Sequence, residues 1–149
     1  MDTAAKSGVV EVTPQVAWDE LAETPDAVLI DVRTRAEWAY VGIPDTAEIS
    51  RTTLLIEWRM FPDMKVNEGF LTNLMEALGG AVPAKMFFLC RSGVRSLQAA
   101  DQVGRTLREQ GFECACINVA EGFEGDLNEQ GHRGSKNGWK VQGLAWKQS

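Results

Sequence analysis

The sequence offers little for binding a metal or crossing a membrane. Its only histidine, His132, lies in a hydrophilic stretch beside Arg133 and Lys136, which argues against a metal site. No P-loop, His-Glu-x-x-His or Cys-x-x-Cys pattern is present. The longest strongly apolar run, residues 86–90, has about five residues and is far shorter than a membrane span. We therefore expect no metal, no cofactor and no membrane partner.

Cysteine and positive charge are also scarce. The chain has 3 cysteines, an odd number, and its N-terminus shows no apolar segment of signal-peptide length, so we expect reduced thiols and a cytoplasmic location. A formal net charge of −6 argues against nucleic acid as the main partner. What is present is the composition of a soluble globular protein, 44% hydrophobic and 24% charged, with 149 residues for one well-buried core.

Short apolar strands alternate with amphipathic helices along the chain. Strands are predicted at residues 9–12, 27–32, 85–90 and 113–119, with a weaker candidate at 47–50, and the longest helix is predicted at 94–110. Such alternation implies right-handed crossovers and a mainly parallel sheet of about five strands, with helices on both faces. We expect a flexible tail at residues 1–8 and one α/β domain at 9–149, with a polar insertion near 126–138.

One junction stands out, the stretch MFFLCRSGVRS at residues 86–96. It starts as a buried strand and ends with side chains that can donate hydrogen bonds. Cys90 therefore lies at the carboxyl end of a strand, which is where parallel α/β sheets bind their ligands. Gly93 permits a tight loop whose N–H groups can surround an anion, and the following helix adds its positive end. A helix N-terminus and nearby cations favour the thiolate form of a cysteine, which is the nucleophile.

The side chains around this cysteine suit an anionic substrate. Arg91 and Arg95 can neutralise an anion, while Ser92 and Ser96 can donate hydroxyl hydrogen bonds. The alternative is a buried structural cysteine, but the polar residues that follow Cys90 do not fit that interpretation. We therefore predict a site made of Cys90 as the catalytic residue and a substrate-binding loop, whose members are Arg91, Ser92, Gly93, Val94, Arg95 and Ser96.

Three stretches together resemble the rhodanese family. They are LIDVRTRAEW at residues 29–38, CRSGVRS at 90–96, and the ending VAEGFEGDL…GWKVQGLAW, and the resemblance covers most of residues 9–146. The sequence departs from the family pattern where a Gly-His-Ile-Pro-Gly stretch lacks its histidine, at residues 41–45, and where a closing proline is Ala145. Neither departure removes a residue assigned to the chemistry.

The resemblance implies a three-layer rhodanese-like fold and a sulfurtransferase. Cys90 would take a sulfane sulfur from a small anionic donor, thiosulfate or a persulfide, and pass it to a thiol, cyanide or protein persulfide acceptor. Arg91 and Arg95 would hold the donor, and arginine directly after the cysteine resembles thiosulfate-using members. Two alternatives stay open: a non-catalytic rhodanese-like regulatory or binding module, and a cysteine-dependent phosphatase on the same fold. Phosphatases of that kind use Cys-x5-Arg, whereas four residues separate Cys90 from Arg95 here.

Other polar residues have a structural interpretation. Asp31, Arg33 and Glu37 follow a buried strand, and we expect them to brace the turn rather than to act as acid and base. Cys114 and Cys116 lie two residues apart, so they share one face of a strand. We expect them to pack in the core, with a resolving thiol for Cys90 as the alternative.

Residues 51–66 are the least determined part of the sequence. They are apolar and aromatic, and the stretch is interrupted by Pro62. Its large side chains could simply cover a face of the sheet. Alternatively, Trp58, Arg59 and Phe61 could form the mouth of the site, where aromatic groups favour a partner and an arginine adds positive charge.

Overall fold

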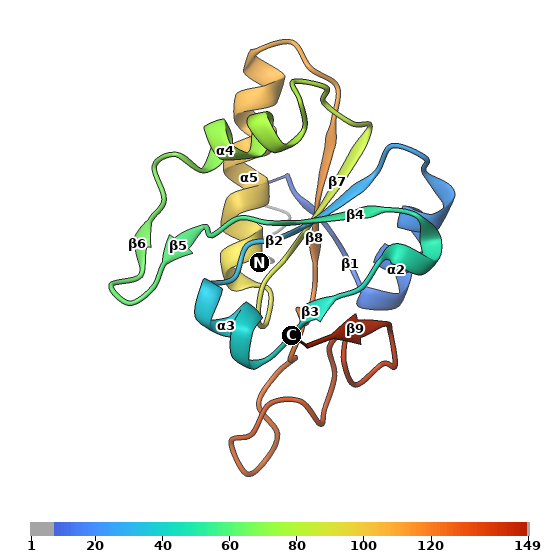
Figure 1. Cartoon of the computed structure of the whole chain (residues 1–149), viewed down its shortest axis with the longest axis vertical. Coiled ribbons are helices and arrows are strands. Elements are labelled where there is room, and N and C mark those ends of the chain that lie inside the picture. Colours follow the sequence, from blue (N-terminus) through green and yellow to red (C-terminus); the bar gives the residue numbers. More distant parts are fainter. Residues whose placement is uncertain (1–7, 149) are drawn as a thin grey trace.

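A five-stranded parallel sheet forms the centre of the computed structural model, which describes residues 8–148 (Figure 1). Residues 1–7, most of the expected tail, and residue 149 lie outside this part. The strand order is β1-β8-β7-β2-β4. The strands are β1 (Val10–Val12), β2 (Val28–Asp31), β4 (Thr52–Leu55), β7 (Lys85–Leu89) and β8 (Ala115–Val119).

Helices cover both faces of this sheet, as Figure 1 shows. They are α2 (Pro14–Glu23) on one face, and α4 (Phe70–Ala77) and α5 (Val94–Glu109) on the other, while the short helix α3 (Arg35–Tyr40) follows β2 and buries no residue. Alternation along β7 divides the core, because Met86 and Phe88 pack on the side of α4 and α5 while Phe87 and Leu89 pack on the side of α2. The predicted α/β class, with a parallel sheet of about five strands between helices, is confirmed.

Local sequence signals account for the helix ends. Thr13 caps α2 by accepting a hydrogen bond from the Val16 N–H, and Pro14 occupies the first turn, where its missing N–H costs nothing. Thr34 and Glu37 form a reciprocal capping box at the start of α3. Gly93, with a φ of 113°, precedes α5.

The segment after α3 differs from the sequence prediction. The candidate strand at residues 47–50 is instead a short 3₁₀ helix, η1 (Ala47–Ile49), and the edge strand is β4, which begins three residues later. The β-branched pair Thr52 and Thr53 favours the extended backbone there. Farther on, β5 (Arg59–Met60) and β6 (Lys65–Val66) form an antiparallel hairpin.

The chain ends on the side of the sheet that carries α2. Trp139 is fully buried there and meets Trp18 of α2 edge-to-face, with ring centroids 5.9 Å apart. The closing strand β9 (Trp146–Lys147) pairs with β3 (Ile43–Pro44). Across residues 8–148, no helix has both the length and the apolar character needed to cross a bilayer.

Candidate active site

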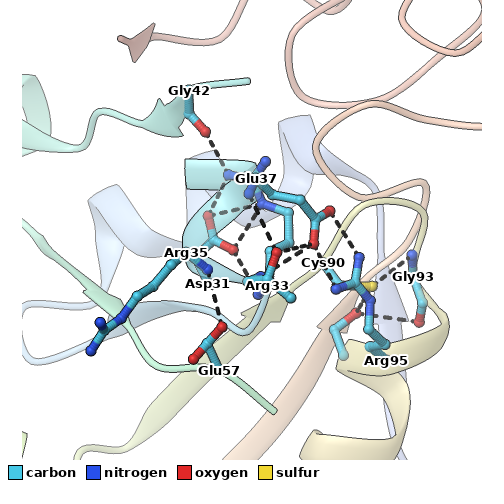
Figure 2. Close-up of polar contacts among 11 residues, drawn as sticks. Asp31, Arg33, Arg35, Glu37, Gly42, Glu57, Cys90, Gly93 and Arg95 are labelled. Carbon is cyan, nitrogen blue, oxygen red and sulfur yellow. Dashed lines mark hydrogen bonds and ion pairs between the residues drawn. The ribbon is translucent and has the colours of Figure 1, made fainter. Parts of the chain in front are cut away.

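Cys90 directly follows β7 and precedes α5, so it lies at the carboxyl edge of the sheet. Its side chain is almost fully buried, with an exposed fraction of 1%. The Gly93 N–H donates a hydrogen bond to Cys90 Sγ over 3.1 Å, and the Ser96 hydroxyl donates over 3.2 Å. Both donors come from the turn that starts α5 (Figure 2 shows the Gly93 contact). The loop therefore presents hydrogen-bond donors to the sulfur, an arrangement that stabilises a thiolate.

The Ser96 hydroxyl belongs to a buried network. It lies 2.5 Å from Asn118 Oδ1 and 3.2 Å from the Gly93 carbonyl oxygen, as well as 3.2 Å from the sulfur. The Asn118 amide donates in turn to Glu11 and to the Gly93 carbonyl oxygen, which fixes its orientation. Because a hydroxyl has one proton, a negative charge on the sulfur would draw that proton away from Asn118.

A second turn, around Gly122, is hydrogen-bonded to the backbone of the cysteine loop. The Phe123 N–H donates to the Cys90 carbonyl oxygen over 2.8 Å, and the Glu124 N–H donates to that of Arg91 over 3.0 Å. Gly122 makes this approach possible, because a Cβ there would lie 2.5 Å from the carbonyl oxygens of both residues. Its φ of 66° also favours glycine.

Arg95 points at Glu37 and binds its carboxylate with both terminal nitrogens, at 2.7 and 2.9 Å (Figure 2). Burial would raise the pKa of Glu37, but the hydrogen bonds and charge of Arg95, helped by the Thr34 N–H and the charge of Arg33, together outweigh it, so the pKa is lowered. For Arg95, burial would lower the pKa, but Glu37, and to a smaller degree Cys90 and Asp31, raise it. The pair therefore stays ionised, and Glu37 neutralises much of the Arg95 charge.

Asp31 and Arg33 form a fully buried ion pair next to this pair. Arg33 donates to both carboxylate oxygens of Asp31, from Nε to Oδ1 over 2.9 Å and from Nη2 to Oδ2 over 2.7 Å. Its Nη2 also donates to the Gly42 carbonyl oxygen. The guanidinium stacks on the Phe123 ring at 4.2 Å. These contacts tie β2 to the turn after α3 and to the turn that holds the cysteine loop, so they position the site.

A cavity of about 540 Å³ opens beside the cysteine loop. Its lining comes from α3, from the loop, from the β5–β6 hairpin and from residues 124–133, and consists of Thr34, Ala36, Glu37, Phe61, Met64, Arg91, Arg95, Glu124, Leu127, Gly131 and Arg133. The Arg91 side chain is exposed, and within residues 8–148 it makes no hydrogen bond or ion pair. Arg91 is thus the loop cation with free donors.

The three residues considered for the mouth of the site, Trp58, Arg59 and Phe61, have different surroundings in the structure. Phe61 lines the cavity, with 61% of it exposed. Trp58 is instead a core residue, 5% exposed, packed edge-to-face on Phe70 with its indole N–H directed at Gln98. Arg59 donates to the Met64 carbonyl oxygen and so holds the hairpin. Of the two interpretations of this segment, Trp58 follows the first, because its apolar surface is buried against Phe70 of α4.

The remaining loop residues lie at the edge of the site. Ser92 is half-buried and Val94 is 66% exposed, and the side-chain hydrogen bond to the Cys90 sulfur comes from Ser96. Two residues that the sequence did not single out belong here instead: Asn118 in the buried network and Arg133 in the cavity wall. A buried polar residue within an apolar strand, as Asn118 is in β8, was the available signal. No comparable signal marked Arg133 within its polar segment.

Cys114 and Cys116 lie at the opposite edge of the sheet. Cys116 pairs with Met86, four residues before Cys90 along β7, which corresponds to about 13 Å along a strand. Both thiols are half-buried and free. They cannot resolve Cys90 without unfolding of the sheet, whereas both pack against the core on the side of α5.

Comparisons with known proteins agree with this geometry. A family model described as the rhodanese-like domain matches residues 13–129. Uncharacterized proteins of Rickettsia rickettsii and Rickettsia conorii are 35% and 34% identical over 130 residues, covering 87% of this chain and 90% of theirs. The crystal structure of Rv0390 from M. tuberculosis is similar at 40% identity, with a TM-score of 0.81, covering 95% of this chain and 98% of that one.

A more distant structure shares the fold. The polysulfide-sulfur transferase homodimer from Wolinella succinogenes is 24% identical, with a TM-score of 0.57, covering 98% of this chain and 83% of that one. The family model spans most of the chain and includes the loop that surrounds the Cys90 sulfur. The chain belongs to the rhodanese-like domain family.

Proposed function

We propose that this protein is a sulfurtransferase that carries a sulfane sulfur on Cys90. The observation that carries the proposal is the pair of donors, Gly93 N–H and Ser96 Oγ, directed at the buried Cys90 sulfur at the N-terminus of α5. Membership of the rhodanese-like family supports sulfur transfer at the level of the family. The Wolinella neighbour, a polysulfide-sulfur transferase, uses the same fold for that chemistry.

In the proposed reaction, the Cys90 thiolate attacks the outer sulfur of thiosulfate. The bond between the two donor sulfurs breaks, and sulfite leaves with the electron pair. The transferred sulfur stays on Cys90 as a persulfide, which the Gly93 N–H and the Ser96 hydroxyl can stabilise. A thiolate or cyanide then attacks the outer sulfur and leaves Cys90 as a thiolate again.

The loop cations take different parts in this step. Arg91 has free guanidinium donors and can hold the departing anion. Arg95 is occupied by Glu37, so its part is to fix α3 against the loop. Asp31 and Arg33 hold the backbone on which both depend.

Intact mass after incubation with thiosulfate tests the proposal. We expect one added sulfur atom, its removal by cyanide, and no addition to the Cys90→Ser variant. A Cys114→Ser, Cys116→Ser double variant is the matched control and should still be loaded. Sulfur found on Cys114 or Cys116 would contradict the proposal, and so would the absence of any addition with both thiosulfate and persulfide donors.

The same protein should be assayed with an aryl phosphate. With four residues between Cys90 and Arg95, and with Arg95 held by Glu37, the arginine that a Cys-x5-Arg loop directs at a phosphoryl group has no counterpart in Arg95. We expect negligible hydrolysis. Hydrolysis that depends on Cys90 would favour a phosphatase instead.

A further inference from the structure

Cys114 and Cys116 form a second cluster of thiols, at the opposite edge of the sheet from Cys90. Both line one cavity of about 130 Å³, and α5 contributes Gly104 and Arg108 to the same lining. Neither thiol takes part in the proposed sulfur transfer. The cavity therefore brings together two side chains that can bind a metal, outside the site already described.

The two thiols point to the same side of the sheet and contact one another. Cys116 lies in β8 and Cys114 lies two residues earlier, and both pack against the core on the side of α5. A hydrogen bond joins the two thiols. Across from them, a Cβ built on Gly104 would lie 3.5 Å from Cys116 Cβ and 3.8 Å from Cys116 Sγ. Glycine at this position of α5 leaves room beside the sulfur that a larger side chain would fill.

The spacing of the pair is unfavourable for a disulfide. Neighbours on one face of a strand lie about 6.6 Å apart, two rises of roughly 3.3 Å, whereas the Cβ atoms of a disulfide lie about 3.5–4.5 Å apart. The backbone between the cysteines is also fixed, because the Ala115 N–H donates to the Ala84 carbonyl oxygen over 2.9 Å and Ala115 pairs with Lys85. An ion placed between the two sulfurs can bridge them without distorting this backbone.

The ligand set selects the ion. Within residues 8–148, no group of three or more His, Cys, Asp or Glu side chains is arranged to hold a metal. Asp101, the only carboxylate among the described residues of the lining, is bound by Arg105 over 3.1 Å. Structural zinc takes four ligands, and iron–sulfur clusters take four cysteines. Two thiolates without a third ligand suit a soft ion that accepts two ligands in line, and Cu(I) is such an ion.

The charges around the pair fit a complex of this kind. Cu(I) bound by two thiolates carries one net negative charge. Arg108 lies in the same lining and forms no ion pair within residues 8–148. The hydrogen bond with Cys114 and burial raise the pKa of Cys116, and the charge of Arg108 opposes them. Asp26, whose charge acts on Cys114, accepts a hydrogen bond from the Ala84 N–H over 3.0 Å. Arg108 is thus the cation available to neutralise the complex.

We infer that Cys114 and Cys116 form a Cu(I) site, in which the ion lies between the two thiolates and Arg108 neutralises the complex. Each thiol gives up its proton to water as Cu(I) binds, and no oxidation state changes. The motifs that the sequence lacks serve zinc or phosphate groups, and a site of two thiolates needs none of them. The expectation of no metal, drawn from those motifs, does not extend to this pair. The inference goes beyond the proposed function and does not depend on it.

Anaerobic titration with Cu(I), in competition with the chelator bicinchoninate, tests the site. A Cys90→Ser background removes the third thiol, and we expect one Cu(I) per chain in it. Cys114→Ala and Cys116→Ala should each weaken binding by at least about a hundredfold, because the loss of a ligand exceeds the roughly 10–100-fold loss of an outer partner. Arg108→Gln should weaken binding by about tenfold. Arg108→Lys is the matched control, since it keeps the charge, and should recover most of that loss.

X-ray absorption at the copper edge identifies the bound atoms directly. We expect two sulfur neighbours and no nitrogen or oxygen neighbour at bonding distance. Nitrogen or oxygen next to copper, or copper binding that survives replacement of both cysteines, would overturn the inference. Zn(II) binding as tight as that of Cu(I) would also overturn it. A loss of two hydrogens in intact mass after treatment with an organic disulfide, without retention of copper by the reduced protein, would make the pair a redox couple instead.

Sulfur loading separates this inference from the proposed function. The double variant with serine at both positions should lose the copper and still take up sulfur from thiosulfate on Cys90. A protein that binds Cu(I) through Cys114 and Cys116 but never loads Cys90 would refute the sulfurtransferase and leave the copper site standing. Loading without copper binding would refute the copper site alone.

Discussion

The two edges of the central sheet each carry cysteine, yet they give it opposite surroundings. At the carboxyl edge, Cys90 is buried and its sulfur accepts hydrogen bonds from Gly93 and Ser96. At the amino edge, Cys114 and Cys116 are half-buried and have mainly one another as polar partners. We therefore expect the reactivity of each thiol to depend on the groups that the backbone places around its sulfur more than on its exposure.

The reason lies in the geometry of a parallel sheet. At the carboxyl edge, the turn into α5 directs N–H groups at whatever follows β7. At the amino edge, the strands receive chain from helix C-termini, which present carbonyl oxygens rather than donors. Only a thiol at the carboxyl edge can be stabilised as an anion by the backbone itself.

We expect the largest effect from a substitution at Gly122, in the turn that is hydrogen-bonded to the cysteine loop. In Gly122→Ala the new Cβ would lie 2.5 Å from the carbonyl oxygens of Cys90 and Arg91, so the loop must move. We expect a loss of about 1–3 kcal/mol in the free energy of unfolding from overpacking, in addition to backbone strain. Sulfur loading of Cys90 should slow roughly a hundredfold, because displaced donors no longer meet the sulfur. Urea unfolding and loading rates measure the two effects.

Gly111→Ala at the other end of α5 is the matched control. Gly111 also has a positive φ, 87°, but nothing lies within 4 Å of a Cβ there. This variant should show the strain alone and keep the wild-type loading rate. Equal stability losses in both variants, with loading unchanged in Gly122→Ala, would refute the idea that this turn shapes the loop.

Ion pairs at the two edges provide a second, smaller contrast. Arg95–Glu37 at the carboxyl edge is mostly buried, whereas Lys85–Glu20 near the amino edge is more exposed. Because the pKa of Glu37 is lowered below 4.5 in the folded protein, its stabilising contribution is present above that value and is lost as the pH falls through the lowered one. Glu37→Gln should cost about 1.5 kcal/mol at pH 7.

Thermal unfolding of wild type and Glu37→Gln across the acid range measures this. The difference in Tm should be constant at neutral pH and should shrink once the pH falls below 4.5. Glu20→Gln, the control at the amino edge, should cost about 0–1 kcal/mol, as exposed pairs do. A difference in Tm that persists at pH 2–3, where carboxylates are protonated, would show that Glu37 acts through packing and not through charge.

The same contrast explains how much could be predicted from the sequence. Apolar strands that alternate with amphipathic helices were sufficient to predict the parallel sheet and the position of Cys90 at its carboxyl edge. Both the apolar strand before Cys90 and Gly93 after it are local signals in the sequence. Asp31 and Arg33, which the sequence analysis interpreted as a brace, form a buried ion pair, and a buried charge after an apolar strand needs a partner of opposite sign.

Contacts between distant segments could not be predicted from local signals in the sequence. The partner of Arg95 proved to be Glu37, 58 positions away, although the arginine was expected to face the donor. Trp58 and Phe61 lie three residues apart in an aromatic stretch, yet one is in the core and the other lines the cavity. The hairpin that separates them follows from pairing between β5 and β6, which sequence periodicity over two-residue strands cannot define.

The smallest expected effect concerns the amino edge alone. A hydrogen bond from Cys116 lowers the pKa of Cys114, although burial and Asp26 oppose it, and the same bond together with burial raises the pKa of Cys116. Replacing Cys116 by alanine removes the donor, so alkylation of Cys114 by iodoacetamide at pH 7.5 should slow by about twofold to tenfold, the range of one neutral hydrogen bond. Cys116→Ser keeps a donor at this position and should recover most of the rate.

Peptide mapping in a Cys90→Ser background follows the alkylation of Cys114 separately. Sulfur loading of Cys116→Ala with Cys90 intact should stay at the wild-type rate. A fall in that loading rate would mean that the two edges are coupled through β7 and β8, and the contrast between them would no longer hold.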